Sequence, residues 1–178
     1  MKKRNECAII SVKNGVMILI FEKETLSFHI LDVVFLDQEN VKMFNSKRNF
    51  DALSFRIKAK TTLETQKDTY ELGDNSVAYV PAGVEYTRIS KKDKLIVVHM
   101  HTLGYSSKRI EHFTSNSHVK LKPLFDEILK IWESKEKGYK HKAGALLYNI
   151  FAQIYEERAD ERHINPKIQN SVEFIEKN

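Results

Sequence analysis

The chain has 178 residues, of which 42% are hydrophobic and 30% charged, a composition typical of a globular protein with one core. Its single cysteine, Cys7, excludes an intramolecular disulfide and a cysteine-based zinc site, and favours a reducing, cytoplasmic setting. The net charge of +5 permits contact with nucleic acid, but Lys and Glu alternate over much of the sequence, so we interpret the charge first as aiding solubility. No segment approaches the roughly 20 apolar residues of a membrane span, so no membrane partner is expected.

The N-terminal part predicts short strands. Two apolar runs, residues 8–12 and 16–21, flank Asn14-Gly15, a pair that favours a type I′ hairpin turn. Residues 28–36 are a further strand candidate, and residues 41–49 fit either a strand edge or a loop.

Residues 53–62 alternate between apolar and polar side chains, which predicts a half-buried strand. The apolar face would carry Leu53, Phe55, Ile57 and Ala59, and the opposite face Ser54, Arg56, Lys58 and Lys60. We expect the basic side chains to form an exposed cationic face.

Residues 70–102 contain two strong turn signals, Gly73-Asp74-Asn75 and Pro81-Ala82-Gly83. Lys91-Lys92-Asp93 predicts a further turn, and the segment ends in His99 and His101, which share one face of a strand. The strands predicted around these turns are residues 69–72, 76–80, 85–89 and 94–102. With the preceding segments they give about eight to ten short strands, which indicates a β-sandwich or barrel.

After the predicted strands, the spacing of the apolar residues predicts helices. Apolar residues recur from Leu121 to Trp132, Gly138 interrupts the pattern, and a second helix is expected over about residues 141–158. Residues 159–163 are interpreted as a charged linker, and Asn165-Pro166 as the start of a third helix. That helix is either a strap on this domain or the beginning of another one.

These elements, in this order, resemble the sensor half of an AraC-type transcription regulator. Residues 48–62 resemble the strand that opens the family's barrel, and residues 71–88 resemble the cupin turn with its Pro-x-Gly corner. Residues 164–178, INPKIQNSVEFIEKN, resemble the linker and first helix of the DNA-binding domain.

The resemblance implies a mainly β fold with C-terminal helices. A cupin-like, jelly-roll β-barrel would occupy residues 1–104, and a two-helix dimerisation hairpin residues 105–159. Residues 160–178 would form the linker and the short first helix of a helix-turn-helix domain whose remainder lies outside this sequence. DNA would be contacted only through that missing domain.

The resemblance also implies a small-molecule effector inside the barrel. The matching positions are Arg48, Tyr86, Arg88, Leu95, Val97, His99 and His101. Tyr rings stack on sugars, while Arg and His donate hydrogen bonds to hydroxyls or carboxylates, so a sugar or an organic acid is expected. For the two arginines, structural ion pairs are the alternative.

The second helix carries an apolar stripe made of Leu146, Leu147, Ile150, Phe151 and Ile154. In the family resemblance this stripe would be the interface of a homodimer, which a regulator needs in order to read two adjacent half-sites. Packing against a neighbouring helix of the same chain is the alternative.

A metal site is not expected. A metal-binding cupin takes two His and a Glu from its first motif and a His from its second, but residues 48–62 contain no His and the second-motif position is Tyr86. His99 and His101 supply only two ligands, and Glu85 is the nearest further donor. There is also no Gly-x-Ser-x-Gly motif and no phosphate loop.

We therefore expect no cofactor and no enzymatic activity. A stand-alone cupin, either a small-molecule-binding protein or a metal-dependent enzyme such as an isomerase or dioxygenase, is the alternative to a regulator.

Overall fold

The computed structural model describes residues 19–116 and 118–163. In chain order its elements are η1 (Ile20–Glu22), β1 (Ser27–Asn45), β2 (Asp51–Glu64), β3 (Thr69–Leu72), β4 (Ser76–Val80), β5 (Tyr86–Leu103), β6 (Glu111–Thr114), α1 (His118–Ser134) and α2 (Tyr139–His163). The prediction of a mainly β fold with two C-terminal helices is confirmed. The predicted N-terminal hairpin, apart from its last residues, and the predicted third helix lie outside the described residues.

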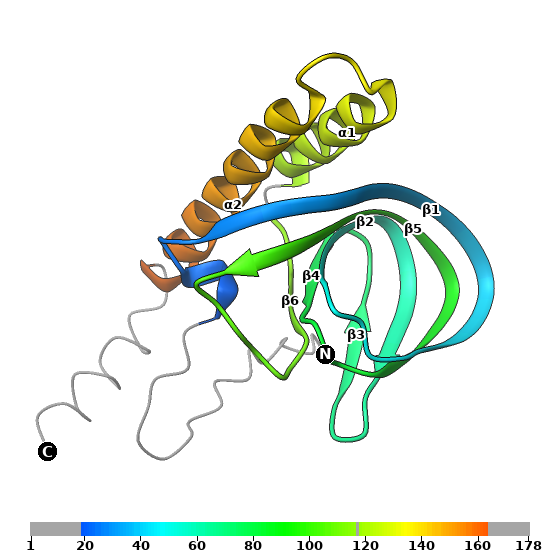
Figure 1. Cartoon of the computed structure of the whole chain (residues 1–178). Helices are drawn as coiled ribbons and strands as arrows, with labels where there is room; N and C mark the ends of the chain where they lie inside the picture. Colours follow the sequence, from blue (N-terminus) through cyan, green and yellow to red (C-terminus); the bar gives the residue numbers. More distant parts are fainter. Residues whose placement is uncertain (1–18, 117, 164–178) are drawn as a thin grey trace, which may run out of the picture.

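The strands form one antiparallel sheet of six, in the order β1-β5-β2-β4-β6, with β3 paired to β2. Figure 1 shows β1, β5 and β2 bending strongly, so that the sheet curls over on itself, with α1 and α2 packed on its outer side. We call the inside of the curl the concave face and the outer side the convex face. The sheet extends beyond residue 104, because β6 pairs with β4.

The predicted turn at Lys91-Lys92-Asp93 is wrong, because β5 runs through it without interruption. The pairing of β5 with β2 shifts here: Thr61 lies opposite Ser90, whereas Lys60 lies opposite Lys92. Lys91 is therefore the extra residue of a β-bulge, which reverses the alternation of side chains between the two faces. A second shift, between Arg56 and Lys58, marks a bulge in β2. Long strands that bend at bulges thus replace most of the short strands expected.

The convex face forms the larger apolar core. Leu53, Phe55 and Ile96 of the sheet are buried there against α1 and α2. The rings of Phe55 and Phe125 stack with their centroids 5.3 Å apart. The apolar sides of α1 and α2, which the helical spacing predicted, therefore cover the convex face of the sheet.

Gly138 separates the helices as predicted, and it adopts φ 83°, a left-handed conformation that favours glycine. The interpretation of residues 159–163 as a linker is wrong, because α2 continues to His163. Within the described residues, neither helix has an apolar stretch long enough to cross a bilayer.

The structure places most of the predicted dimer stripe inside the chain. Leu147, Ile150 and Ile154 have no exposed surface, and Phe151 is 8% exposed. Leu146 is partly buried and packs against the same core. These side chains cover α1 and the convex face, so they are not displayed on the surface of the described protein.

Candidate functional site

The concave face combines a small apolar core with buried polar side chains. Its apolar members are Ala52, Leu63, Leu72, Ala78, Val80, Tyr86, Leu95, Val97 and Ile110. The register places Ser54, Arg56, Thr61, Arg88, Ser90 and Asp93 on the same face, and all six are buried. Because neither helix of the described residues covers this side, its polar groups are the candidates for binding a ligand.

Two arginines share one carboxylate at the centre of the face. Arg56 is 3% exposed, Arg88 is 7% exposed and Asp93 is fully buried. Arg56 Nε lies 3.2 Å from Asp93 Oδ1, and Arg88 Nη1 lies 3.6 Å from Asp93 Oδ2. Arg88 also donates a hydrogen bond through Nη2 to Gln38 of β1.

Burial lowers the pKa of Arg56, and the charge of Arg88 acts in the same direction, whereas Asp93 opposes the shift. An arginine remains protonated even so, because its ordinary pKa is far above neutral. The face therefore holds fixed positive charges.

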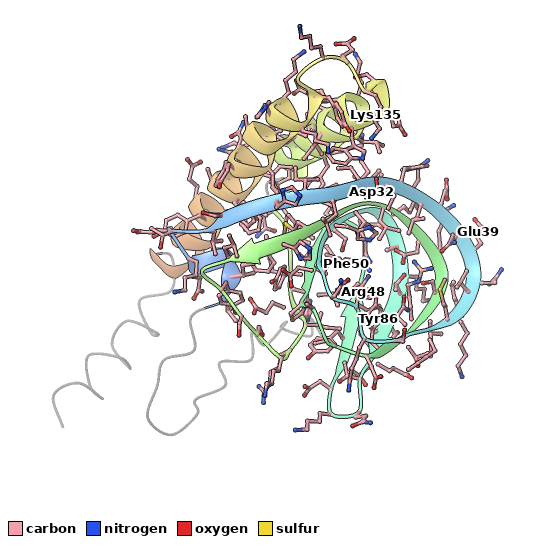
Figure 2. All side chains as sticks on the ribbon, viewed as in Figure 1. Asp32, Glu39, Arg48, Phe50, Tyr86 and Lys135 are labelled. Carbon is pink, nitrogen blue, oxygen red and sulfur yellow. The ribbon has the colours of Figure 1, made fainter. Side chains whose placement is uncertain are left out.

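A third arginine lies beside this pair. The Arg48 guanidinium carbon is 5.2 Å from the ring centroid of Phe50 and 5.6 Å from that of Tyr86. Figure 2 shows these three residues together inside the curl. Arg48 Nε and Nη2 are buried and have no hydrogen-bond partner among the described residues.

Backbone contacts hold the corner that carries Arg48. The Gly83 N–H donates to the Arg48 carbonyl at 2.8 Å, and Gly83 adopts φ 78° in the predicted Pro-x-Gly turn. The buried Asp51 carboxylate accepts hydrogen bonds from Ala82 N–H at 2.8 Å and from Thr102 N–H at 3.0 Å. The corner is thus fixed before any ligand binds.

The two strand histidines differ in their surroundings. His99 is half-buried, and its ring centroid lies 4.8 Å from that of Phe50. Burial lowers the pKa of His99, and the nearby Arg48 adds to this effect. His101 is exposed and lies opposite His29 of β1. Within residues 19–116 and 118–163, no three His, Cys, Asp or Glu side chains are grouped closely enough to hold a metal ion.

The structure brings six of the seven predicted ligand residues together on or beside the concave face. They are Arg48, Tyr86, Arg88, Leu95, Val97 and His99. His101 lies on the same face by strand alternation but is exposed to solvent.

Sequence reasoning missed Arg56 and Asp93. The predicted exposed cationic face is wrong for Arg56 and Ser54, which are buried, although Lys58 and Lys60 are exposed. The reason is that residues 51–56 are buried on both faces, so alternation alone does not separate buried from exposed side chains. Asp93 was assigned to a turn that is in fact the bulge of β5.

The described residues therefore form a curled antiparallel sheet. Its concave face is cationic and buried, and a helical hairpin packs on its convex face. No protein-family model matches the sequence, and no curated protein matches it. Among solved structures the chain is similar to apo ToxT K231A from Vibrio cholerae, with a TM-score of 0.50 and 13% identity over 76% of this chain and 59% of that one.

Two weaker similarities have TM-scores below that of this ToxT structure. The AraC-like transcriptional activator CuxR gives 0.41, with 10% identity over 72% of this chain and 52% of that one. A second ToxT structure from Vibrio cholerae gives 0.34, with 11% identity over 73% and 57%.

At 13% identity the ToxT similarity defines the fold alone, and this chain spans about three-fifths of the length of that ToxT chain.

Proposed function

We propose that this chain is the effector-sensing domain of an AraC-type transcription regulator. A small molecule binds against the concave face, which we interpret as the interior of a cupin-like barrel, and controls DNA binding by a domain outside this sequence. The observation that carries the proposal is the set of buried, incompletely partnered polar groups at Arg48 and Arg88. The ToxT-like fold supports it.

The proposed role is binding rather than catalysis. Arginines supply the positive charges of the concave face, and an arginine holds an acceptor without exchanging a proton near neutral pH. The carboxylate of this face, Asp93, is already engaged by two arginines as their counter-charge.

A route from the concave face to the helices supports the proposed control. His99 contacts Phe50 on the ligand side and lies opposite Asp32 in the β1–β5 ladder. Asp32 Oδ1 accepts a hydrogen bond from Trp132 Nε1 of α1 at 2.8 Å. A ligand that moves His99 would thereby act on the helical hairpin, provided that it binds two arrangements with different affinity.

A homodimer and a cytoplasmic location complete the proposed role, since a regulator of paired half-sites acts as a dimer on DNA. The dimer would use exposed side chains of the hairpin, because Leu147 and its neighbours are occupied inside the chain. Tyr148, which is 49% exposed and packs beside Phe28 of β1, is a candidate for that interface.

The test uses native mass spectrometry of the purified protein after incubation with a small-molecule extract of the cells that produce it. We expect one small molecule per chain, lost in Tyr86→Ala on the concave face and kept in Thr87→Ala on the opposite face of β5. Failure of the unsubstituted protein to retain any small molecule contradicts the proposal, as does equal retention by both variants. DNA affinity of the full-length protein should then change when that molecule is added.

A further inference from the structure

We infer that the molecule recognised by the concave face is a small organic anion, whose carboxylate or phosphate group binds Arg48 and the free edge of Arg88. This inference rests on the proposed sensing function and names the chemical class of the ligand.

The charges on the concave face do not balance. Arg56 and Arg88 both pair with Asp93. These three side chains therefore carry two positive charges and one negative charge, which leaves a net charge of about +1. Arg48 has no ion-pair partner among the described residues, which raises the excess to two. A neutral sugar would leave that excess in place, whereas a mono- or dianion would cancel it.

The protein cannot relieve this excess by losing protons. Burying a charged group costs free energy unless it is paired and hydrogen-bonded, and a buried Lys or His responds by becoming neutral. The guanidinium does not, because its pKa is too high. Two N–H groups of Arg48 and the Nε of Arg88 are buried without a hydrogen-bond partner in the part of the chain that the structure describes. These donors require an acceptor from outside.

The three arginines lie on the same face as Tyr86 or beside it. Arg48 lies over the Tyr86 ring at 5.6 Å, and Tyr86 is close enough to Arg56 to influence the pKa of that arginine. Arg88 follows Tyr86 by two residues on the same face of β5. The rings of Phe50 and Tyr86 both lie close to the Arg48 guanidinium, and a planar fork of N–H donors matches the oxygens of a carboxylate or phosphate.

Apolar side chains beside the donors fit the carbon skeleton of such a ligand. Leu95 and Val97 lie on the same face of β5 as Asp93, and Ala52 and Val80 belong to the same cluster. The site therefore suits an organic anion better than a bare inorganic one, since burial of hydrocarbon adds to the charge-assisted hydrogen bonds.

The first test needs no ligand. Arg48→Met keeps most of the side-chain length and removes the unpaired charge, while Lys60→Met makes the same change at an exposed position of β2. In buffer free of organic anions and phosphate, we expect Arg48→Met to melt at the same temperature as the unsubstituted protein or above it. A fall in Tm of about 5 °C or more, relative to Lys60→Met, would mean that Arg48 is structural and would overturn the inference.

The second test measures binding by thermal shift and calorimetry at constant ionic strength. The probes are succinate and citrate as carboxylates, glycerol phosphate as a phosphate ester, inorganic phosphate, and succinamide and arabinose as neutral molecules. We expect a saturable stabilisation by at least one organic anion, at least about tenfold weaker in Arg48→Met and unchanged in Lys60→Met. The neutral probes should give none.

Three outcomes overturn the inference: no saturable effect of any anion, equal effects on Arg48→Met and the unsubstituted protein, or specific binding of a neutral probe. The last of these leaves the sensing function standing and removes only the ligand class. Carboxylate and phosphate probes that bind with different affinity identify which of the two groups the site takes.

Discussion

Asp93→Asn should destabilise the protein more than any other single change to a charged residue of the concave face. The substitution keeps the size of the side chain but leaves Arg56 and Arg88 buried without a counter-charge. Asp93 is fully buried, and its two carboxylate oxygens lie 3.2 Å and 3.6 Å from the two guanidinium groups. Both arginines stay charged, so the loss cannot be compensated by deprotonation.

Removing one partner of a buried ion pair typically costs about 3–5 kcal/mol of unfolding free energy. Because two cations depend on Asp93, we expect a value at the upper end of that range. For a chain of this size each kcal/mol corresponds to a change in Tm of about 2–4 °C, so Tm should fall by about 10–20 °C.

The assay is urea unfolding followed by the fluorescence of Trp132, the only tryptophan. Asp37→Asn is the matched control, because Asp37 pairs with Lys94 at 3.4 Å with both side chains exposed. An exposed pair contributes about 0–1 kcal/mol. The reasoning is refuted if Asp93→Asn costs no more than Asp37→Asn, since the arginines would then be compensated by something other than this carboxylate.

Three further predictions concern the core, the backbone and pH. Leu147→Ala should cost about 2–5 kcal/mol in urea unfolding without changing the oligomeric state measured by light scattering, because Leu147 is buried within the chain; a changed oligomeric state with little loss of stability would return this residue to a dimer interface. Gly83→Ala should lower the free energy of unfolding by about 1 kcal/mol, because Gly83 has φ 78°. Gly144→Ala should raise it by up to about 1 kcal/mol, because Gly144 lies inside α2 with open space around the added carbon. Equal effects of the two substitutions in urea unfolding would contradict this. His99 has a pKa lowered from 6.5, so its contribution to stability is present above pH 6.5 and is lost as pH falls towards the folded-state pKa. His99→Gln should therefore flatten the fall in unfolding free energy below pH 6.5, measured beside the exposed His101→Gln; an unchanged slope would show that His99 is not its source.

Local signals in the sequence predicted the parts of the fold that local chemistry determines. The turn after Gly73 and the corner at Pro81-Ala82-Gly83 lie where expected, since a glycine or asparagine at positive φ defines each of them. The two helices follow from their apolar spacing. Most of the expected ligand-facing residues also lie on one face, because strand alternation holds between bulges.

The bulges themselves could not be predicted, because a bulge is a property of two paired strands and not of one. Neither the stretch around Ile57 nor that around Lys91 has a glycine or proline to mark it. The length of β1 and β5 escaped prediction for the same reason. Lys92 was assigned to a turn and residues 37–40 to no strand, but Lys92 and Glu39 pair across β5 and β1 at 3.3 Å. Arg56 was missed because both faces of the sheet are buried at this point. A basic side chain in an alternating strand is ordinarily solvated.

The bulge at Lys91 accounts for the presence of a carboxylate in the cationic interior. Without the extra residue, alternation from Arg88 and Ser90 would turn Lys92 inward and Asp93 outward, to the side of the sheet where Lys60 is exposed to solvent. The concave face would then gain a cation and lose the carboxylate that pairs with Arg56 and Arg88 among the described residues. With the bulge, Asp93 faces inward and is sufficient to hold Arg56 and Arg88 in place, yet insufficient to neutralise them together with Arg48. The same local irregularity thus stabilises the fold and leaves a positive charge that the proposed anion would neutralise.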